Sequence, residues 1–129
     1  MPQYWILKTE PSEYAFADLQ RDGRTRWDGI SNPVALKHLR SMHRGDQAMV
    51  YHTGDEKRVV GLATVASEPD EHAVVELEAG RSVATPVTLA AIKADPAFKD
   101  LALVRMGRLS VVPVPADLWK KLLGMAGVR

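Results

Sequence analysis

The feature that most constrains the fold is the short spacing between the β-prone runs of the chain. Such runs are predicted at residues 3–8, 46–52, 58–66, 72–77, 81–89 and 109–114. A parallel pair of strands needs a crossover of about a dozen or more residues between them, and most of these gaps are shorter. The spacing therefore favours a mixed α+β fold built on a small barrel of five to six mostly antiparallel strands.

Short helices are expected near the start and the end of the chain, over residues 12–19, 32–44, 89–100 and 115–127. Residues 89–100 are predicted to hold one or two short helices, broken at Asp95-Pro96. Ser12 has the chemistry of an N-cap, and Asn32 followed by Pro33 is typical of a helix start. Gly45 is predicted to cap the second helix. Residues 20–31, between the first two helices, are predicted to form a polar loop.

Several side chains are predicted to build the core or shape the sheet. Ala35, Leu39 and Met42 share one face of the second helix. In the last helix, the apolar face consists of Leu118, Trp119, Leu122 and Leu123. Gly61 lies inside a β-prone run, where glycine often marks a bulge or a close backbone approach.

Length and composition are those of one globular domain over residues 1–129. Hydrophobic residues make up 46% of the chain and charged residues 26%. The sequence contains no cysteine, which excludes disulfides, thiolate metal sites and a cysteine nucleophile. The N-terminus MPQYWILKTE lacks the pattern of a signal peptide, and no apolar run is long enough to span a membrane. These features predict a soluble, cytoplasmic protein without a membrane partner.

Charge is unevenly distributed although the formal net charge is only +1. Residues 105–129 hold five basic side chains and one acidic one, whereas residues 61–104 are acidic. This distribution is compatible with a local basic binding surface and equally with ordinary solvated faces.

The stretch RWDGISNPVALK at residues 26–37 places a tryptophan and an aspartate just before a helix start. A helix N-terminus attracts anions, Trp27 offers a flat apolar face, and Asp28 or Asn32 can hydrogen-bond the edge of a base. The alternative is that Trp27 packs against the helix and Asp28 is an ordinary turn residue.

Three further segments carry candidate site residues. Lys8, Thr9 and Glu10 end the first strand, and Tyr51 and His52 end the second. Two arginines, Arg105 and Arg108, and Ser110 have the chemistry of phosphate contacts. Each set can also be read as surface pairs and solvated cations, which contribute little to stability.

Sequence patterns of common enzyme sites are missing. The chain has no HExxH or similar histidine cluster, no G-x-S-x-G elbow, and no phosphate-binding glycine loop. We therefore expect no metal, no cofactor and no catalytic residue.

The ordered set of segments YWILKTEP, WDGISN, YHT, GLATV and RLSVVPV resembles the EVE domain family along essentially the whole chain. This resemblance implies a PUA-like pseudobarrel, related to YTH and ASCH domains, and the binding of modified bases, with modified cytosine first. YTH domains hold methylated adenine in an aromatic cage. Lys8, Thr9, Trp27, Asp28 and Asn32 match positions of the YTH pattern, but SEPDEHAVV lacks the later cage aromatic.

The resemblance also implies roles for the candidate residues. Trp27 would stack on the base, while Asp28, Thr9 or Glu10 would bond its edge. Lys8, Arg105 and Arg108 would contact phosphate. The pocket or its rim would also include Asn32, Tyr51, His52 and Ser110.

Three functions follow as hypotheses. The first is a monomeric, non-enzymatic reader of a modified base in DNA, RNA or a free nucleotide. The second is a general RNA-binding module like PUA or ASCH domains. The third is an enzyme acting on modified nucleotides, with His52 or Glu10 as general base.

Overall fold

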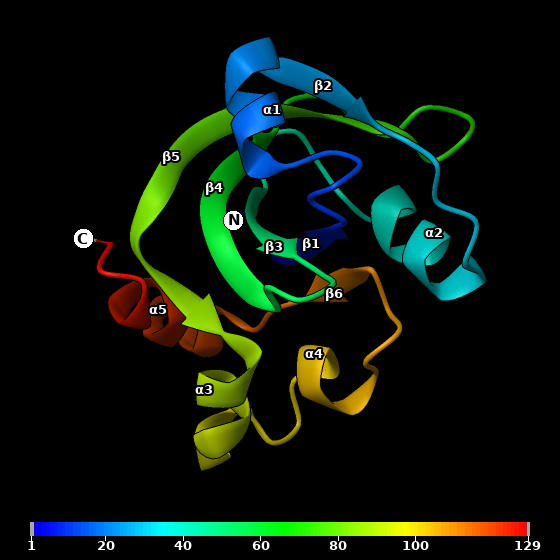
Figure 1. Ribbon diagram of the computed structural model, residues 1–129. Helices are drawn as coiled ribbons and strands as arrows, with labels where there is room; N and C mark the ends of the chain where they lie inside the picture. Colours follow the sequence, from blue (N-terminus) through cyan, green and yellow to red (C-terminus); the bar gives the residue numbers. More distant parts are fainter. Residues whose placement is uncertain (1, 129) are drawn as a thin grey trace.

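One curled sheet forms the centre of the protein, whose computed structural model describes residues 2–128 (Figure 1). Within these residues six strands are arranged in the order β2-β5-β4-β3-β1-β6. Their bounds are β1 Tyr4–Thr9, β2 Arg24–Trp27, β3 Gln47–His52, β4 Arg58–Val65, β5 Val75–Thr88 and β6 Val111–Pro113. All neighbouring pairs are antiparallel except β1 and β3. The predicted α+β pseudobarrel of mostly antiparallel strands is confirmed.

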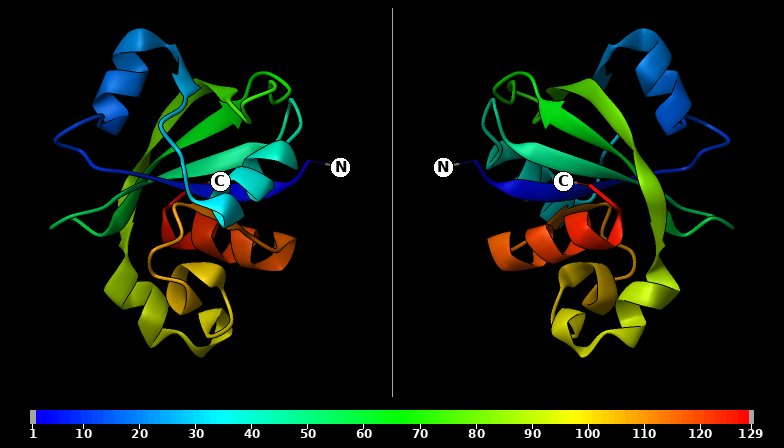
Figure 2. Two further views of the ribbon diagram at one scale, coloured as in Figure 1. Left: turned by 90° about the vertical axis from the view of Figure 1, so that its right-hand side faces the viewer. Right: turned by 90° about the vertical axis from the view of Figure 1, so that its left-hand side faces the viewer.

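The parallel pair β1 and β3 is joined by a long crossover, residues 10–46, that carries α1 (Phe16–Asp22), β2 and α2 (Pro33–Arg40). Within this crossover β2 pairs with β5 at the edge of the sheet. Figure 2 shows the crossover leaving β1, rising through α1 and returning past α2. The crossover thereby brings Trp27, the last residue of β2, next to Lys8 and Thr9 at the end of β1.

A buried carboxylate fixes one end of the crossover. Asp46 is 2% exposed and precedes β3. It accepts hydrogen bonds from the Gln3 N–H at 3.0 Å, the Trp5 Nε1–H at 3.1 Å and the His43 N–H at 3.0 Å. Because a buried carboxylate needs such partners, Asp46 couples the start of β1 to the start of β3.

The core lies between the sheet and the helices packed around it. Trp5, Ile6 and Leu7 are consecutive and all buried, so both faces of β1 are covered. The predicted inner-face residues Ala35, Leu39 and Met42 are also buried, although Met42 lies after the end of α2. In α5 (Ala116–Met125), Trp119 and Leu122 are buried as predicted, while Leu118 and Leu123 are half-buried.

The remaining helices, α3 (Leu89–Ala94), the 3-10 helix η1 (Pro96–Phe98) and α4 (Ala102–Arg105), connect β5 to β6. The predicted break at Asp95-Pro96 is confirmed, since α3 ends at Ala94. The Asp95 carboxylate accepts the Ala97 N–H at 2.9 Å and starts η1. Sequence patterns did not predict α4.

Two predictions for the crossover are wrong. A helix does not begin at Ser12, whose hydroxyl donates to the Glu10 carboxylate at 3.2 Å. It begins at Phe16, where Asp18 accepts the Ala15 N–H at 2.8 Å. Residues 20–31 are not all loop, because they contain the end of α1 and the strand β2. Pairing with β5 stabilises β2, and this tertiary contact is invisible in the local sequence.

The predicted pair of strands at residues 72–77 and 81–89 is also wrong, because Val75–Thr88 is one long strand. The residues read as a turn bend this strand instead. A Cβ atom at Gly80 would lie 2.7 Å from the Leu62 carbonyl oxygen, so glycine there permits close contact with β4.

Helix α2 ends at Arg40 and not near Arg44, with Ser41 in the C-cap position. Gly45 does not cap the helix. It has a φ of 95° in the turn before β3, and its N–H donates to the Val65 carbonyl at 2.8 Å. A left-handed glycine is thus present, but in the following turn.

Gly61 confirms the predicted irregularity in β4. The pairing register of β4 and β5 shifts between Val59 and Gly61. A Cβ atom at Gly61 would overlap the ring of Phe16, the first residue of α1. The bare backbone therefore lets α1 pack directly on the curled sheet.

Replacing Gly61 by alanine should destabilise the fold, because Phe16 would have to move away from the core. We expect the free energy of unfolding to fall by about 1–3 kcal/mol, as for other overpacked sites. The matched control is Gly124→Ala in α5, where no atom lies within 4 Å of the added Cβ. This control should stabilise slightly. Urea unfolding of both variants tests the account, and equal stability of the two would contradict it.

Candidate functional site

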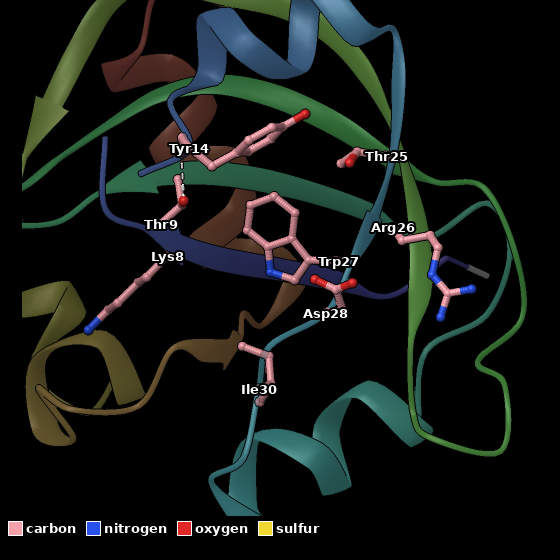
Figure 3. Close-up of a pocket in the computed structure, with 8 residues that line it drawn as sticks. All are labelled: Lys8, Thr9, Tyr14, Thr25, Arg26, Trp27, Asp28 and Ile30. Atoms are coloured by element: carbon pink, nitrogen blue, oxygen red, sulfur yellow. Dashed lines mark hydrogen bonds between the residues drawn. The ribbon is translucent and has the colours of Figure 1, made fainter. Parts of the chain in front are cut away.

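A pocket of about 260 Å³ opens between the end of β1 and the segment that carries β2 toward α2. We call it the Trp27 pocket. Figure 3 shows the Trp27 indole at the centre of the lining side chains. The lining residues are Lys8, Thr9, Tyr14, Thr25, Arg26, Trp27, Asp28 and Ile30. Two come from β1, and the others come from the crossover.

Packing fixes the Trp27 side chain. It is 7% exposed, and the Tyr14 ring meets it edge-on with centroids 6.4 Å apart. Within residues 2–128 the Trp27 Nε1–H has no hydrogen-bond acceptor. All fully buried side-chain donors in this range are paired, so an unpaired donor must lie at the surface. The indole N–H is therefore accessible from the pocket. Trp27 thus forms a rigid aromatic wall of the pocket, and its Nε1–H is a free hydrogen-bond donor.

The polar groups beside Trp27 differ in how many hydrogen bonds and ion pairs they already make within the protein. Asp28 is exposed and makes no hydrogen bond or ion pair with residues 2–128, so its carboxylate is available to a donor. The Thr9 hydroxyl donates to the Tyr14 carbonyl at 2.7 Å and keeps lone pairs that can accept. Arg26 extends away from Trp27 (Figure 3), and its guanidinium pairs with Asp70 at 3.5 Å.

Lys8 forms one side of the pocket. Its ammonium donates to the Gly107 carbonyl at 2.9 Å and lies 5.6 Å from the centroid of the Tyr51 ring. Burial lowers the pKa of Lys8 because desolvation penalises its charged form. No carboxylate pairs with it in the described chain, so an anion at this point would meet an uncompensated cation.

His52 supports the site from inside the fold. It is buried, and its Nε2 accepts the Phe16 N–H at 3.0 Å. Its Nδ1 lies 2.9 Å from the Glu56 carboxylate. Both contacts are satisfied together only by the neutral tautomer that carries its proton on Nδ1. The hydrogen bond from His52 lowers the pKa of Glu56. His52 thus positions the start of α1, and it does not line the Trp27 pocket.

Other predicted site residues lie around the pocket. The Glu10 carboxylate accepts from the hydroxyls of Ser12 and Thr53 at 3.2 Å each. Tyr51 is buried behind Lys8. Asn32 caps α2 by accepting from the Val34 N–H at 2.9 Å. None of these three side chains lines the Trp27 pocket.

The predicted phosphate contacts are separated from one another. Arg105 is engaged by the Asp100 carboxylate at 3.1 Å. Arg108 is exposed, has no partner within residues 2–128, and lines a separate cavity of about 300 Å³ together with Asn32. Ser110 accepts the Lys8 N–H through its carbonyl at 2.9 Å. Of the two arginines, Arg108 is therefore the one without an acidic partner in the described chain.

Sequence reasoning missed four lining residues, namely Tyr14, Thr25, Arg26 and Ile30. The sequence could have predicted Thr25, because residues 25 and 27 lie on the same face of a strand over residues 24–27. Tyr14 and Ile30 lie in irregular segments, and only the tertiary fold brings them to the pocket.

Two other features are missing from the part of the chain that the structure describes. In residues 2–128, no three histidine, aspartate or glutamate side chains gather as a metal site requires. No helix in the same range combines the length and apolarity needed to cross a bilayer.

The curled six-stranded sheet and its crossover have a PUA-like fold, which solved structures of EVE and ASCH proteins share. The sequence model of the EVE domain family matches residues 3–125, and the chain belongs to this family.

Known relatives extend this comparison. The NMR structure of Rpa0253 from Rhodopseudomonas palustris is 38% identical, with a TM-score of 0.90 over 97% of this chain and 93% of that one. Human THYN1, crystallised in complex with DNA containing 5-methylcytosine, is 22% identical, with a TM-score of 0.88 over 98% of this chain and 99% of that one. At this identity the human structure establishes the shared fold alone.

Among curated proteins, rat thymocyte nuclear protein 1 is 31% identical over 80 residues, which are 53% of this chain and 35% of that protein. The chain thus matches about a third of the length of this relative.

Replacing His52 by alanine should destabilise the protein, because the Phe16 N–H would lose its acceptor. We expect a loss of about 1–3 kcal/mol in the free energy of unfolding, typical of a buried unpaired donor. Glu56→Gln is the control, since its amide oxygen can still accept from Nδ1–H and the loss should be smaller. A His52→Ala variant as stable as wild type would contradict the structural role.

Proposed function

We propose that the chain binds a modified nucleobase in DNA or RNA without converting it, with modified cytosine as the first candidate. One observation carries this proposal: the Trp27 indole, held rigidly, lies next to the unpaired Asp28 carboxylate in a base-sized pocket. Membership of the EVE family supports it, as does the human relative crystallised with 5-methylcytosine DNA.

The chemistry of the pocket matches the groups on cytosine. A base turned out of its strand needs an aromatic surface to stack on and partners for its polar edge. Trp27 offers the surface for stacking. Asp28 can accept from the exocyclic amine of cytosine. Tyr14 and Ile30 provide apolar surface for an added methyl group.

Phosphate contacts would come from the cations around the pocket. Lys8 and Arg108 lack acidic partners in the described residues, whereas Arg105 is paired with Asp100. We therefore propose Lys8 and Arg108 as phosphate contacts, and affinity should fall with salt.

A binding role without catalysis is favoured because the two candidate general bases, His52 and Glu10, already make hydrogen bonds within the protein. Both nitrogens of His52 are engaged inside the fold, and the Glu10 carboxylate is tied to Ser12 and Thr53. Neither side chain lines the Trp27 pocket. A general base must reach the proton it removes.

Several broader expectations stay predictions. We propose that residues 1–129 act as one domain, as a monomer, and in the cytoplasm. The choice between DNA, RNA and a free nucleotide also belongs to the proposal.

The proposal predicts selective binding that depends on Asp28. Oligonucleotides that differ only in cytosine, 5-methylcytosine, 5-hydroxymethylcytosine, adenine or methylated adenine should bind with unequal affinity. Asp28→Ala should weaken binding of the preferred ligand by about 10–100-fold, corresponding to the loss of one contact of about 1–3 kcal/mol. Fluorescence anisotropy at two salt concentrations measures both effects.

Two further variants make this test specific. Trp27→Phe keeps an aromatic wall and should retain part of the preference, whereas Trp27→Ala removes the wall and requires a check of folding, because Trp27 is buried. Asp117→Ala, an exposed aspartate on α5 far from the pocket, is the charge-matched control. Equal binding of all bases, unaffected by Asp28→Ala, would instead indicate a general nucleic-acid-binding module.

A further inference from the structure

A second cavity of about 260 Å³ adjoins the Trp27 pocket, and Lys8 lines both. It lies between the end of β3, the β3–β4 turn, α3 and α4. Three lysines line it, namely Lys8, Lys57 and Lys93, and no acidic residue is among its lining side chains. We call it the lysine groove.

Backbone contacts bring the three lysines together from distant parts of the chain. The Leu89 N–H donates to the Lys57 carbonyl at 2.8 Å, which joins the start of α3 to the start of β4. Lys93 lies four residues after Leu89 in α3, so both share one helix face. Leu89 lines the groove with it. The cluster is therefore a product of the fold and not of a charged run in the sequence.

These cations have no acidic partners. Lys57 and Lys93 form no ion pair with residues 2–128, and Lys8 contacts a carbonyl and an aromatic ring. Glu56 pairs with Arg58 at 3.2 Å. The Glu10 carboxylate bonds Thr53, which lines the groove, but it forms no ion pair with any of the three lysines. Three lysines beside this one carboxylate leave the groove with net positive charge, which favours an anionic ligand.

Lys57 is also held in an unusual backbone conformation. Its φ is 46°, in the left-handed region that glycine and asparagine adopt more readily. A lysine at such a position is a backbone outlier at the rim of a charged cavity, and outliers of this kind concentrate at functional sites.

We propose that the lysine groove binds the phosphate groups next to the base held in the Trp27 pocket. This inference rests on the proposed function, because Lys8 links the two cavities and directs the strand from one to the other. The groove adds Lys57 and Lys93 to the binding site. These contacts are to phosphate, so they raise affinity for modified and unmodified strands alike.

The test compares two variants of equal charge. Lys57→Asn with Lys93→Gln removes two cations from the groove, and asparagine suits the left-handed backbone at position 57. Lys99→Gln with Lys120→Gln removes two exposed cations outside the groove. Affinity for a single-stranded oligonucleotide carrying 5-methylcytosine is measured across a range of salt concentrations.

We expect the groove variant to lose affinity by a factor that depends on salt. Two lost contacts on a single strand reduce the slope of log affinity against log salt by about 1.4, so the loss is about sevenfold larger at ~50 mM than at ~200 mM salt. The preference for the modified base should not change. The free nucleoside 5-methylcytidine, which lacks phosphate, should bind wild type and variant equally.

Other results separate the two proposals. If the groove variant matches the control variant in slope while the base preference persists, the lysine groove inference is wrong and the proposed function stands. If the groove variant reduces the slope but no base is preferred, the groove binds phosphate and the base-reader proposal is wrong. Absence of binding to every strand at low salt would overturn both.

Discussion

The parallel pairing of β1 with β3 determines most of what this protein can do. Two parallel neighbours cannot be joined by a tight turn, so the chain must leave the end of β1 and return to the start of β3. The crossover that results carries Tyr14, Trp27, Asp28 and Ile30, while β1 itself ends in Lys8 and Thr9. The pocket therefore forms where the chain leaves the sheet. Buried polar side chains fix this arrangement at both ends of β3, since Asp46 bonds the start of β1 and His52 bonds the start of α1.

This arrangement explains why a large aromatic residue lies just before a helix. Trp27 is both the last residue of an edge strand and a wall of the pocket, so packing with Tyr14 and pairing with β5 hold the indole before any ligand arrives. A preformed wall lowers the ordering cost of binding. Asp28, one residue later, has left the strand and stays unpaired. The change from strand to loop between these two residues places a rigid surface beside a free acceptor.

Much of the fold could be predicted from local patterns, and the failures share one cause. The strands β1, β3 and β4, the Asn32 cap and the irregularity at Gly61 follow from β-propensity, capping chemistry and the bare backbone of glycine. The short strand β2 depends on pairing with β5, and the undivided strand β5 pairs along its length with β4; local sequence does not report such pairing. The same limit applies to the site. Lys8, Thr9, Trp27 and Asp28 were found from their places at element ends, but Tyr14, Ile30 and the lysines of the groove are assembled only by the tertiary fold.

The central claim is that a base binds against Trp27, and the three tryptophans of the chain allow a direct measurement. Their indole N–H groups have distinct surroundings: Trp5 donates to Asp46, Trp119 stacks on Tyr4 with ring centroids 4.8 Å apart, and Trp27 has no acceptor within residues 2–128. The ¹H–¹⁵N indole resonances should be followed while a short oligonucleotide with one 5-methylcytosine is added, beside the same oligonucleotide with cytosine. The account predicts a saturable shift of the Trp27 resonance, larger at equal concentration for the modified strand, with Trp5 and Trp119 nearly unchanged. A strand that binds while the Trp27 resonance stays in place would contradict it.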